Sequence, residues 1–290
     1  KRLYAPLSNT LGAASCSGIF FGLNVTANTS LPNAEDFRAG LYLRYSGLQP
    51  TVASEQDVIC FRGAAETARS LQLQMHNRWN PELNAALIPG SDQVTAYQGA
   101  RLADGCLWTK RTELPDTWEQ VMLLCVPILD GGGTVRGFCG AEISDLYFSL
   151  SHNTVPSAFG NMLTLAAPID GDSLLLSGAM LGATDGSRLT ANGILHISDG
   201  KYYTTYSDGK NTYLGRHQLL DAATWDGIPP AAVTLVPDGT FRSYEKGSQI
   251  AWFLGAVLFL LAMLVVATVL SRQFVKPINK SLAAVRGGAE

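Results

Sequence analysis

Two hydrophobic patterns divide the chain. Up to about residue 248, short apolar runs of β-strand length alternate with turn signals, and a single uninterrupted apolar stretch then runs from Ile250 to Leu270. The turn signals are repeated Asp-Gly pairs, for example at Asp130, Asp170 and Asp199. Asp-Gly between apolar runs is the strongest short-range signal for a β-hairpin. The pattern therefore predicts a region of antiparallel hairpins followed by one long apolar helix.

The apolar stretch has the length and composition of a membrane span. Ile250–Leu270 contains no charged residue, no Pro and no Asn or Gln. A helix rises about 1.5 Å per residue, so a helix of this length crosses a hydrocarbon core of roughly 30 Å. Backbone groups inside lipid must bond to one another, which favours a helix. We predict a transmembrane helix over residues 249–271; the alternative is a buried helix in a water-soluble core.

The charges that flank this stretch predict its orientation. Arg272, Lys276, Lys280 and Arg286 follow it, and only Glu290 opposes them. The excess of positive charge on cytoplasmic loops predicts a cytoplasmic segment 272–290 and an extracytoplasmic region 1–248. Because the chain begins at Lys1 without Met, we expect it to be a piece of a longer protein.

Composition and punctuation suggest two modules outside the membrane. One helix is expected over Cys60–Met75, where Ala, Leu and Met recur at near-helical spacing. The Pro- and Gly-marked segment 151–161 separates two groups of predicted strands. We therefore expect an α+β fold with antiparallel sheets, divided into a membrane-distal module over residues 1–150 and a membrane-proximal module over residues 151–248.

Charge and cysteine content exclude some functional classes. Charged residues make up 16 % of the chain and its formal net charge is −3, so no basic patch suggests that this portion binds nucleic acid. The five cysteines show neither a CxxC pair nor a zinc-ligand spacing, and we predict no metal and no cofactor. We expect buried free thiols, with one disulfide as the alternative.

One short motif raises the possibility of an esterase. Gly171 to Leu174 read GDSL, but the chemistry needs a histidine supported by an aspartate beside the nucleophilic serine. None of the four histidines has an Asp three residues before it, and the motif lies in a predicted hairpin turn. We predict no enzymatic activity.

The hairpin MLLCVPILDGGGTVRGFCGAEIS resembles the closing strands of a Cache domain, a PAS-like extracellular sensor module. The residues that carry this resemblance are Pro127, Asp130, Gly131, Gly137, Gly140 and Glu142. The segment GILHISDGKYYTTYS resembles the smaller, membrane-proximal module of a double Cache region. The stretch from Cys16 to Arg44 looks like the sensor regions of membrane-bound regulators from Firmicutes, some of which end in a LuxR-type DNA-binding domain.

The resemblance implies a small-molecule ligand in the distal module. Amino-acid-binding members of the family carry Tyr, Arg and a Trp-Tyr pair in the loop before the hairpin, and an acidic residue at the end of the returning strand. The corresponding candidates are Tyr97, Arg101, Trp108 and Glu142, although no adjacent Trp-Tyr pair is present. Trp79 and Arg62 are weaker candidates. An Arg can hold a carboxylate, and a Glu can hold a cation.

The segment FVKPINKSLAAVR resembles the entry of a HAMP-type signalling helix. Ile278, Leu282 and Val285 share one helical face, and Pro277 is tolerated in a first turn. A basic anchor against anionic lipid is the alternative. These features together predict the sensor region of a transmembrane receptor, acting as a homodimer and signalling to a cytoplasmic kinase or transcriptional regulator. A membrane-tethered binding or adhesion module is the rival hypothesis.

Overall fold

The structure is a computed structural model of the 290-residue chain. It describes residues 4–26, 29–30, 32–46, 58–76, 82–99, 101–152, 156–157, 160–182, 189, 193–220, 223–224 and 227–287. The chain forms two compact units. The N-terminal unit ends at Pro237, and the C-terminal unit begins at Asp238.

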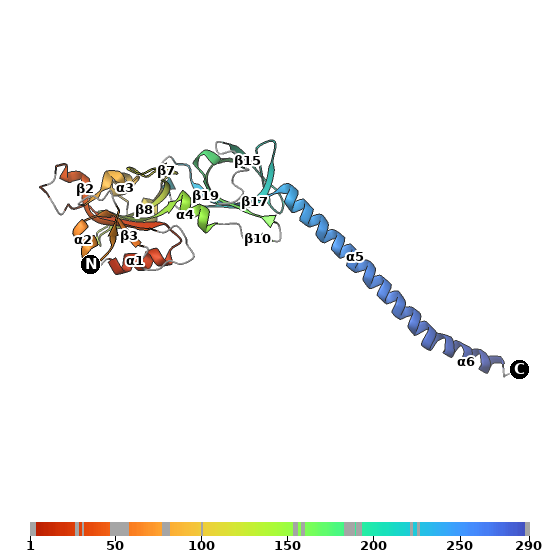
Figure 1. The fold of residues 1–290 in the computed structure, drawn as a ribbon. Coiled ribbons are helices and arrows are strands. Elements are labelled where there is room, and N and C mark those ends of the chain that lie inside the picture. The colour runs from red at the N-terminus through yellow and green to blue at the C-terminus, as the bar shows by residue number, and fades with distance from the viewer. Residues whose placement is uncertain are drawn as a thin grey trace. The chain divides into compact units, whose positions relative to one another are not determined.

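The first sheet of the N-terminal unit has ten strands within the described residues, in the order β18-β6-β8-β9-β1-β2-β3-β4, with β5 beside β2 and β7 beside β8 (Figure 1). All neighbours are antiparallel except β3–β4 and β6–β18. The strands are β1 (Gly18–Leu23), β2 (Phe37–Tyr45), β3 (Val58–Gly63), β4 (Gln74–Met75), β5 (Leu83–Asn84), β6 (Leu107–Trp108), β7 (Thr112–Glu113), β8 (Gln120–Leu129), β9 (Val135–Ser144) and β18 (Ala223–Thr224).

Hydrophobic cores lie on both faces of the first sheet. Helices α1 (Tyr4–Ala13) and α2 (Ala65–Ser70) pack on one face, through Leu11 and Ala68 (Figure 1). The segment from β5 to α3 (Ser91–Thr95) packs on the other face, which we call the inner face, against Phe20, Tyr42 and Phe138. Successive side chains of a strand point to opposite faces, so alternate residues of β1, β2, β8 and β9 supply the two cores.

The predicted central hairpin is confirmed as β8 and β9. The Asp130 carboxylate accepts hydrogen bonds from the backbone N–H groups of Gly132 and Thr134, both at 2.9 Å, and so closes the turn. Gly133 has φ = 81°, a left-handed conformation that glycine adopts without steric cost. The turn fixes the register in which Leu123 lies opposite Glu142.

The helix predicted over Cys60–Met75 is wrong at both ends. Val58–Gly63 forms β3 and Gln74–Met75 forms β4, which leaves only the six-residue α2. The run VICFRG is rich in β-branched and aromatic residues, and it pairs with β2. Gly63, at φ = 130°, ends the strand before the helix can begin. Tertiary pairing therefore outweighs the local spacing of Ala and Leu.

A second sheet has seven strands within the described residues, in the order β13-β15-β16-β17-β19-β12-β14, with β12 also pairing with β13. Its core includes Leu165, Leu195, Tyr206 and Leu235. The GDSL motif lies at the predicted hairpin: Gly171 and Asp172 form the turn between β12 and β13, and Ser173 and Leu174 begin β13. The strands are β12 (Leu163–Asp170), β13 (Ser173–Leu175), β14 (Met180–Leu181), β15 (Ile194–Asp199), β16 (Thr204–Ser207), β17 (Thr212–Leu219) and β19 (Pro230–Pro237); β10 (Pro156–Ser157) and β11 (Gly160–Asn161) form a separate pair.

In the described part of the chain, the contacts between the two sheets include a helix packed between them and a shared strand pairing. Helix α4 (Asp145–Ser151) follows β9, and its Phe148 packs against Met122 of β8 and Met180 of β14. We call these three residues the inter-sheet cluster; Trp108, Ile143 and Ala166 pack around it. In addition, β18 pairs with β6. The division at residue 150 stays a prediction, and the chain beyond it also supplies a strand to the first sheet.

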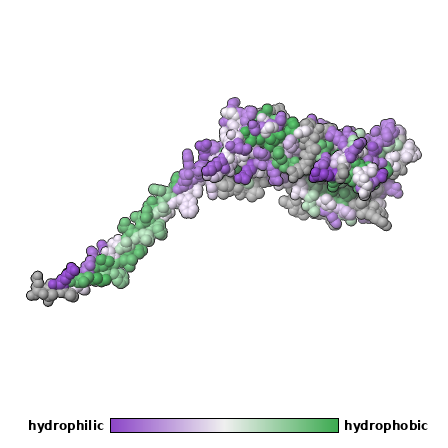
Figure 2. Space-filling model, turned by 180° about the vertical axis from the view of Figure 1, so that it is seen from behind, coloured by the Kyte–Doolittle hydropathy of each residue, from purple (hydrophilic) through white to green (hydrophobic). Residues whose placement is uncertain are grey.

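The C-terminal unit is a helix with one local irregularity. Helix α5 (Asp238–Leu270) leads through a π-helical segment (Ser271–Val275) into α6 (Lys276–Gly287). The residues Asp238–Ala284 are long and apolar enough, by length and composition, to cross a membrane, which confirms the predicted apolar helix. Figure 2 shows the apolar side chains gathered along this helix. Pro277 lacks an N–H and its ring collides with the carbonyl four residues earlier, which accounts for the irregularity before α6.

All five cysteines are free thiols, as expected. Cys16, Cys60 and Cys125 are buried, and Cys106 and Cys139 are half-buried. Burial raises the pKa of Cys16 to about 11, with the nearby Glu142 charge adding to the effect, and burial alone raises the pKa of Cys60 to about 11. The thiols therefore stay protonated at neutral pH and pack as small apolar groups.

Candidate functional site

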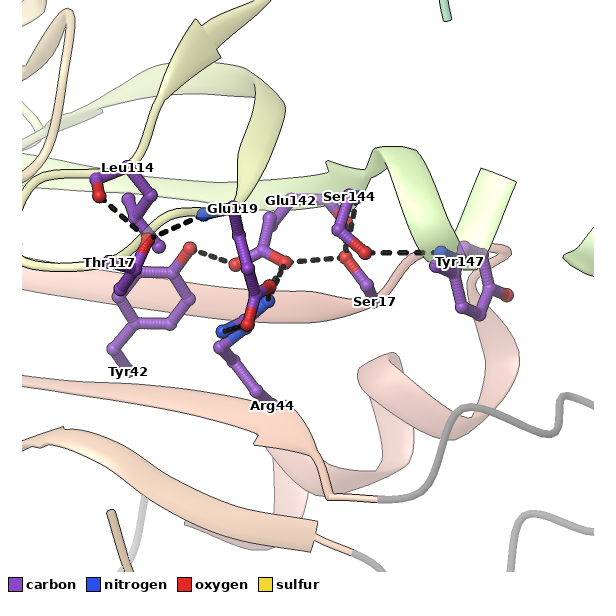
Figure 3. Close-up of polar contacts among 9 residues, drawn as sticks. All are labelled: Ser17, Tyr42, Arg44, Leu114, Thr117, Glu119, Glu142, Ser144 and Tyr147. Atoms are coloured by element: carbon purple, nitrogen blue, oxygen red, sulfur yellow. Dashed lines mark hydrogen bonds and ion pairs between the residues drawn. The ribbon is translucent and has the colours of Figure 1, made fainter. Parts of the chain in front are cut away.

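Glu142 lies at the centre of a buried polar network (Figure 3). Its side chain is inaccessible to solvent. The Ser17 hydroxyl donates to Oε1 at 2.6 Å, and Arg44 donates to the same oxygen through Nε at 3.1 Å and Nη2 at 3.0 Å. The Tyr42 hydroxyl donates to Oε2. Four donor groups thus compensate for the removal of this carboxylate from water.

The guanidinium of Arg44 joins two carboxylates. Arg44 pairs with the buried Glu142 and also with Glu119, whose side chain is one-third exposed. The group of three charged side chains therefore extends from the core toward solvent. Burial lowers the pKa of Arg44, but the neighbouring carboxylates of Glu142 and Glu119 outweigh it and raise the pKa. Burial and the Glu142 charge raise the pKa of Tyr42 well above its usual value, so Tyr42 is a permanent donor.

Strand alternation places these side chains together. Tyr42 and Arg44 are two residues apart on β2, and Glu142 lies opposite Gly18 on the neighbouring β1. A Cβ atom at Gly18 would come within 3.0 Å of the Arg44 side chain, so glycine leaves the room that Arg44 occupies. Sequence analysis missed Ser17, Tyr42, Arg44 and Glu119. The period-two pattern of LYLRY puts Tyr42 and Arg44 on one face of a strand, but such a pattern does not identify the acidic residue that they contact.

The network continues into helix α4. The Ser144 N–H donates to the Ser17 hydroxyl at 2.9 Å, and the Ser144 hydroxyl accepts from the Tyr147 N–H at 3.2 Å as the N-cap of α4. Arg111 forms a further ion pair with Asp145 in the first turn of α4, at 2.5 Å. The position of α4 therefore depends on the same hydrogen bonds that hold Glu142.

The structure brings two of the predicted ligand-binding residues, Tyr97 and Arg101, together, and it places Trp108 and Glu142 on opposite faces of the first sheet. Tyr97 donates its hydroxyl to the Arg101 carbonyl at 2.6 Å, while the Arg101 side chain is 80 % exposed and lies 3.9 Å from Asp104. Trp108 packs at the inter-sheet cluster, on the face of the sheet opposite to Glu142. Trp79 lies outside the described residues. A ligand-binding role for these residues stays a prediction.

An open cleft of about 610 Å³ lies at the N-terminal end of β2. Its polar side chains are Asp36, Arg38, Ser91, Asp92 and Thr95, and the segment 85–90 supplies a mostly apolar wall. This volume lies within the range of small-molecule sites, which is roughly 300–1,000 Å³. Among the described residues, no group of three or more His, Cys, Asp or Glu side chains is arranged to hold a metal ion.

The chain resembles several solved sensor domains at low similarity. The ligand-binding domain of the Pseudomonas aeruginosa PAO1 amino acid chemoreceptor PctB, in complex with L-Arg, matches with a TM-score of 0.42 and 13 % identity, over 91 % of this chain and 83 % of that one. The extracellular domain of the putative histidine kinase soHK1S-Z6 gives 0.41 and 12 %, over 83 % and 78 %. The periplasmic sensory domain of the Campylobacter jejuni chemoreceptor Tlp1 gives 0.42 and 10 %, over 83 % and 79 %.

No protein-family profile and no curated protein sequence matches the chain. The solved structures are too distant to assign a family or a ligand, so the function must be argued from the chain's own residues.

Proposed function

We propose that this chain is the extracytoplasmic ligand-sensing region and membrane helix of a signal-transduction receptor. A small molecule binds the N-terminal unit, and the change passes through α5 to a cytoplasmic output, a kinase or a transcriptional regulator. The basic residues after the apolar stretch favour a cytoplasmic C-terminus.

The observation that carries this proposal is the direct passage from the second sheet into the membrane helix. Strand β19 is hydrogen-bonded on both sides, to β12 and β17, and it ends at Pro237. Helix α5 begins at the next residue, Asp238. No loop residue separates the strand from the helix along the chain, and we propose that a shift of β19 is passed to α5. Helix displacements of about 1–2 Å are a common scale for such switching.

A contiguous set of contacts within the N-terminal unit supports the same proposal. Ser17 and Ser144 connect Glu142 to the first turn of α4. Phe148 of α4 packs on Met180 of β14, which pairs with β12, and β12 pairs with β19. Each step is a packed contact or a hydrogen bond, so contiguous contacts connect the network to β19, as coupling between distant sites through packed side chains requires.

The cytoplasmic end is suited to pairing with a second copy. Ile278 and Leu282 lie four residues apart on α6 and are both exposed in the single chain. Such an apolar stripe is covered when two signalling helices associate. We therefore infer that the receptor works as a homodimer, with the π-helical segment as the point where α6 changes direction relative to α5.

A thermal-shift screen tests the proposal. The full chain in detergent micelles is heated with amino acids, carboxylates, amines and small sugars, since a ligand that binds only the folded state raises Tm by mass action. We expect at least one class to raise Tm in proportion to the logarithm of its concentration. Arg101→Ala, at an exposed candidate position, then tests whether Arg101 contacts that ligand. No shift across the panel would contradict small-molecule sensing and favour a tethered module that binds a protein.

A further inference from the structure

Arg62 is a buried cation whose hydrogen-bonding capacity is only partly used. It lies on β3 and is 2 % exposed. Its Nη2 donates to the Pro115 carbonyl at 2.5 Å, but Nε and Nη1 have no hydrogen-bond acceptor in the described part of the chain. The nearest charge is the Asp116 carboxylate, 3.6 Å from Nη1, and that side chain is 55 % exposed.

Arg44 shows what a structural arginine in the same place looks like. Both guanidinium groups lie over the ring of Phe61, at 4.7 Å for Arg44 and 4.8 Å for Arg62. Arg44 gives every nitrogen an acceptor on Glu142 or Glu119. In contrast, Nε and Nη1 of Arg62 have no hydrogen-bond acceptor among the described residues. Burial lowers the pKa of Arg62, and the nearby Asp116 carboxylate only partly offsets this effect. A buried charged donor without acceptors destabilises a fold, so its presence calls for an acceptor from elsewhere.

A surface turn lies beside Arg62 and contacts it through Pro115 and Asp116. The turn from Leu114 to Glu119 is closed by its own hydrogen bonds, from the Leu114 N–H to the Glu119 carbonyl and from the Thr117 N–H back to Leu114. Asp116 lies in this turn with φ = 62°, and Trp118 beside it is 82 % exposed. The turn therefore places a displaceable carboxylate at Arg62 and an aromatic ring at the surface.

We propose that Arg62 is the anion-binding residue of the sensor and takes the carboxylate group of a small organic acid at Nε and Nη1. This assignment rests on the proposed sensing function and adds its ligand chemistry. In the protein without ligand, the Asp116 carboxylate forms a weak ion pair with Arg62 in the place of the ligand. The carboxylate of the ligand then replaces that of Asp116. Carboxylate oxygens are strong acceptors for guanidinium N–H groups, and their charge neutralises Arg62 inside the protein.

The experiment compares binding and stability in matched variants. Acetate, pyruvate, lactate, succinate and benzoate, with sodium chloride as the salt control, are titrated into the full chain in detergent micelles, and Tm and Kd are measured. The variants are Arg62→Met, Arg62→Lys, Asp116→Asn, Arg44→Met and Asp92→Asn. Asp92 lies in the separate open cleft, so Asp92→Asn is the control for nonspecific loss of binding.

The expected result separates Arg62 from Arg44. At least one carboxylate binds the unaltered chain, and both Arg62 variants weaken it by about tenfold or more, the loss of at least one charge-assisted hydrogen bond. Asp116→Asn strengthens it, because the competing carboxylate is gone. Without ligand, Arg62→Met keeps or raises Tm, whereas Arg44→Met lowers Tm because Glu142 is left buried without its partner.

Four results would overturn the assignment. A fall in Tm for Arg62→Met as large as that for Arg44→Met would make Arg62 a structural residue. Unchanged carboxylate affinity in the Arg62 variants would place the site elsewhere. So would a loss of carboxylate binding in Asp92→Asn alone. Failure of every carboxylate to bind would also refute it; if a compound without a carboxylate still raises Tm, the sensing function stands while the Arg62 site falls.

Discussion

At the scale of single residues, the inner face of the first sheet combines two kinds of buried charge. Glu142 and Arg44 satisfy each other, while Arg62 retains unused donors in the described chain. Buried ion pairs contribute little net stability compared with apolar packing, yet breaking one by removing a partner is costly. Glu142 therefore has a structural role on this face of the sheet. A ligand could contact it only by displacing one of the groups that now donate hydrogen bonds to it.

Replacing the Glu142 carboxylate tests how strongly the network holds the fold. Glu142→Gln removes the charge that Arg44 needs, so we expect the free energy of unfolding to fall by roughly 3–5 kcal/mol. Urea denaturation followed by tryptophan fluorescence measures the change. Glu113→Gln, at an exposed position, is the control and should alter stability by less than about 0.5 kcal/mol. Equal effects of the two substitutions would show that the network has no structural role.

The buried thiols predict a pH dependence. Because the folded-state pKa of Cys16 and of Cys60 is raised from 9.0 to about 11, the fold holds protons that the unfolded chain has released. Their contribution is complete below about pH 9 and is lost as the pH rises toward about 11. Urea denaturation at pH 8 and pH 10.5 should show lower stability at the higher pH. The double variant Cys16→Ala and Cys60→Ala should reduce this difference, and a difference of the same size would assign it to other groups.

At the scale of elements, sequence patterns predicted the strands better than the helices. The β8–β9 hairpin was predictable because its apolar runs, its Asp-Gly turn and its glycine positions all agree with one local structure. The segment from Cys60 to Met75 misled because its helix-forming residues follow β3, a strand that forms only by pairing with the separate segment β2. Buried acceptors and donors such as Glu142 and Arg44 meet only after strand pairing, so sequence alone could not join them.

The hairpin predicts a sharp contrast between two glycines. A Cβ atom at Gly140 would lie 1.9 Å from the Leu124 carbonyl oxygen and 2.5 Å from the Phe20 ring, whereas one at Gly131 has nothing within 4 Å. Gly140→Ala should therefore lower the free energy of unfolding by about 1–3 kcal/mol or more, because β8 and Phe20 must shift. Gly131→Ala should leave it nearly unchanged. Thermal denaturation measures the Tm of both variants. Equal Tm values would refute the close packing of Gly140 against Leu124 and Phe20.

At the scale of the whole molecule, the proposed signalling depends on the connection between the two sheets. The sequence predicted two groups of strands and an apolar helix, but nothing in it revealed that Phe148 packs across to Met180. This contact joins residues of two different strand groups, and its apolar members look like ordinary core residues in the sequence.

The inter-sheet cluster should transmit the effect of a ligand. Phe148→Ala leaves a cavity between α4 and β14 and should lower stability by roughly 3–5 kcal/mol. Ligand affinity, measured by titration calorimetry below the lowered Tm, should change little, because Phe148 is remote from the inner face of the first sheet. Leu146→Ala, at an exposed position on the same helix, is the matched control. Loss of ligand binding in Phe148→Ala alone would instead place the ligand at this cluster.

The central claim is that ligand binding in the N-terminal unit reaches the membrane helix. Hydrogen–deuterium exchange of the full chain in lipid nanodiscs, with and without a compound that raises Tm, tests it most directly. The account predicts altered exchange in α4, β14 and β19 and in residues 271–275, and loss of the changes beyond α4 in Phe148→Ala. Changes confined to the first sheet, with β19 and residues 271–275 unaffected, would contradict signalling and leave a tethered binding module.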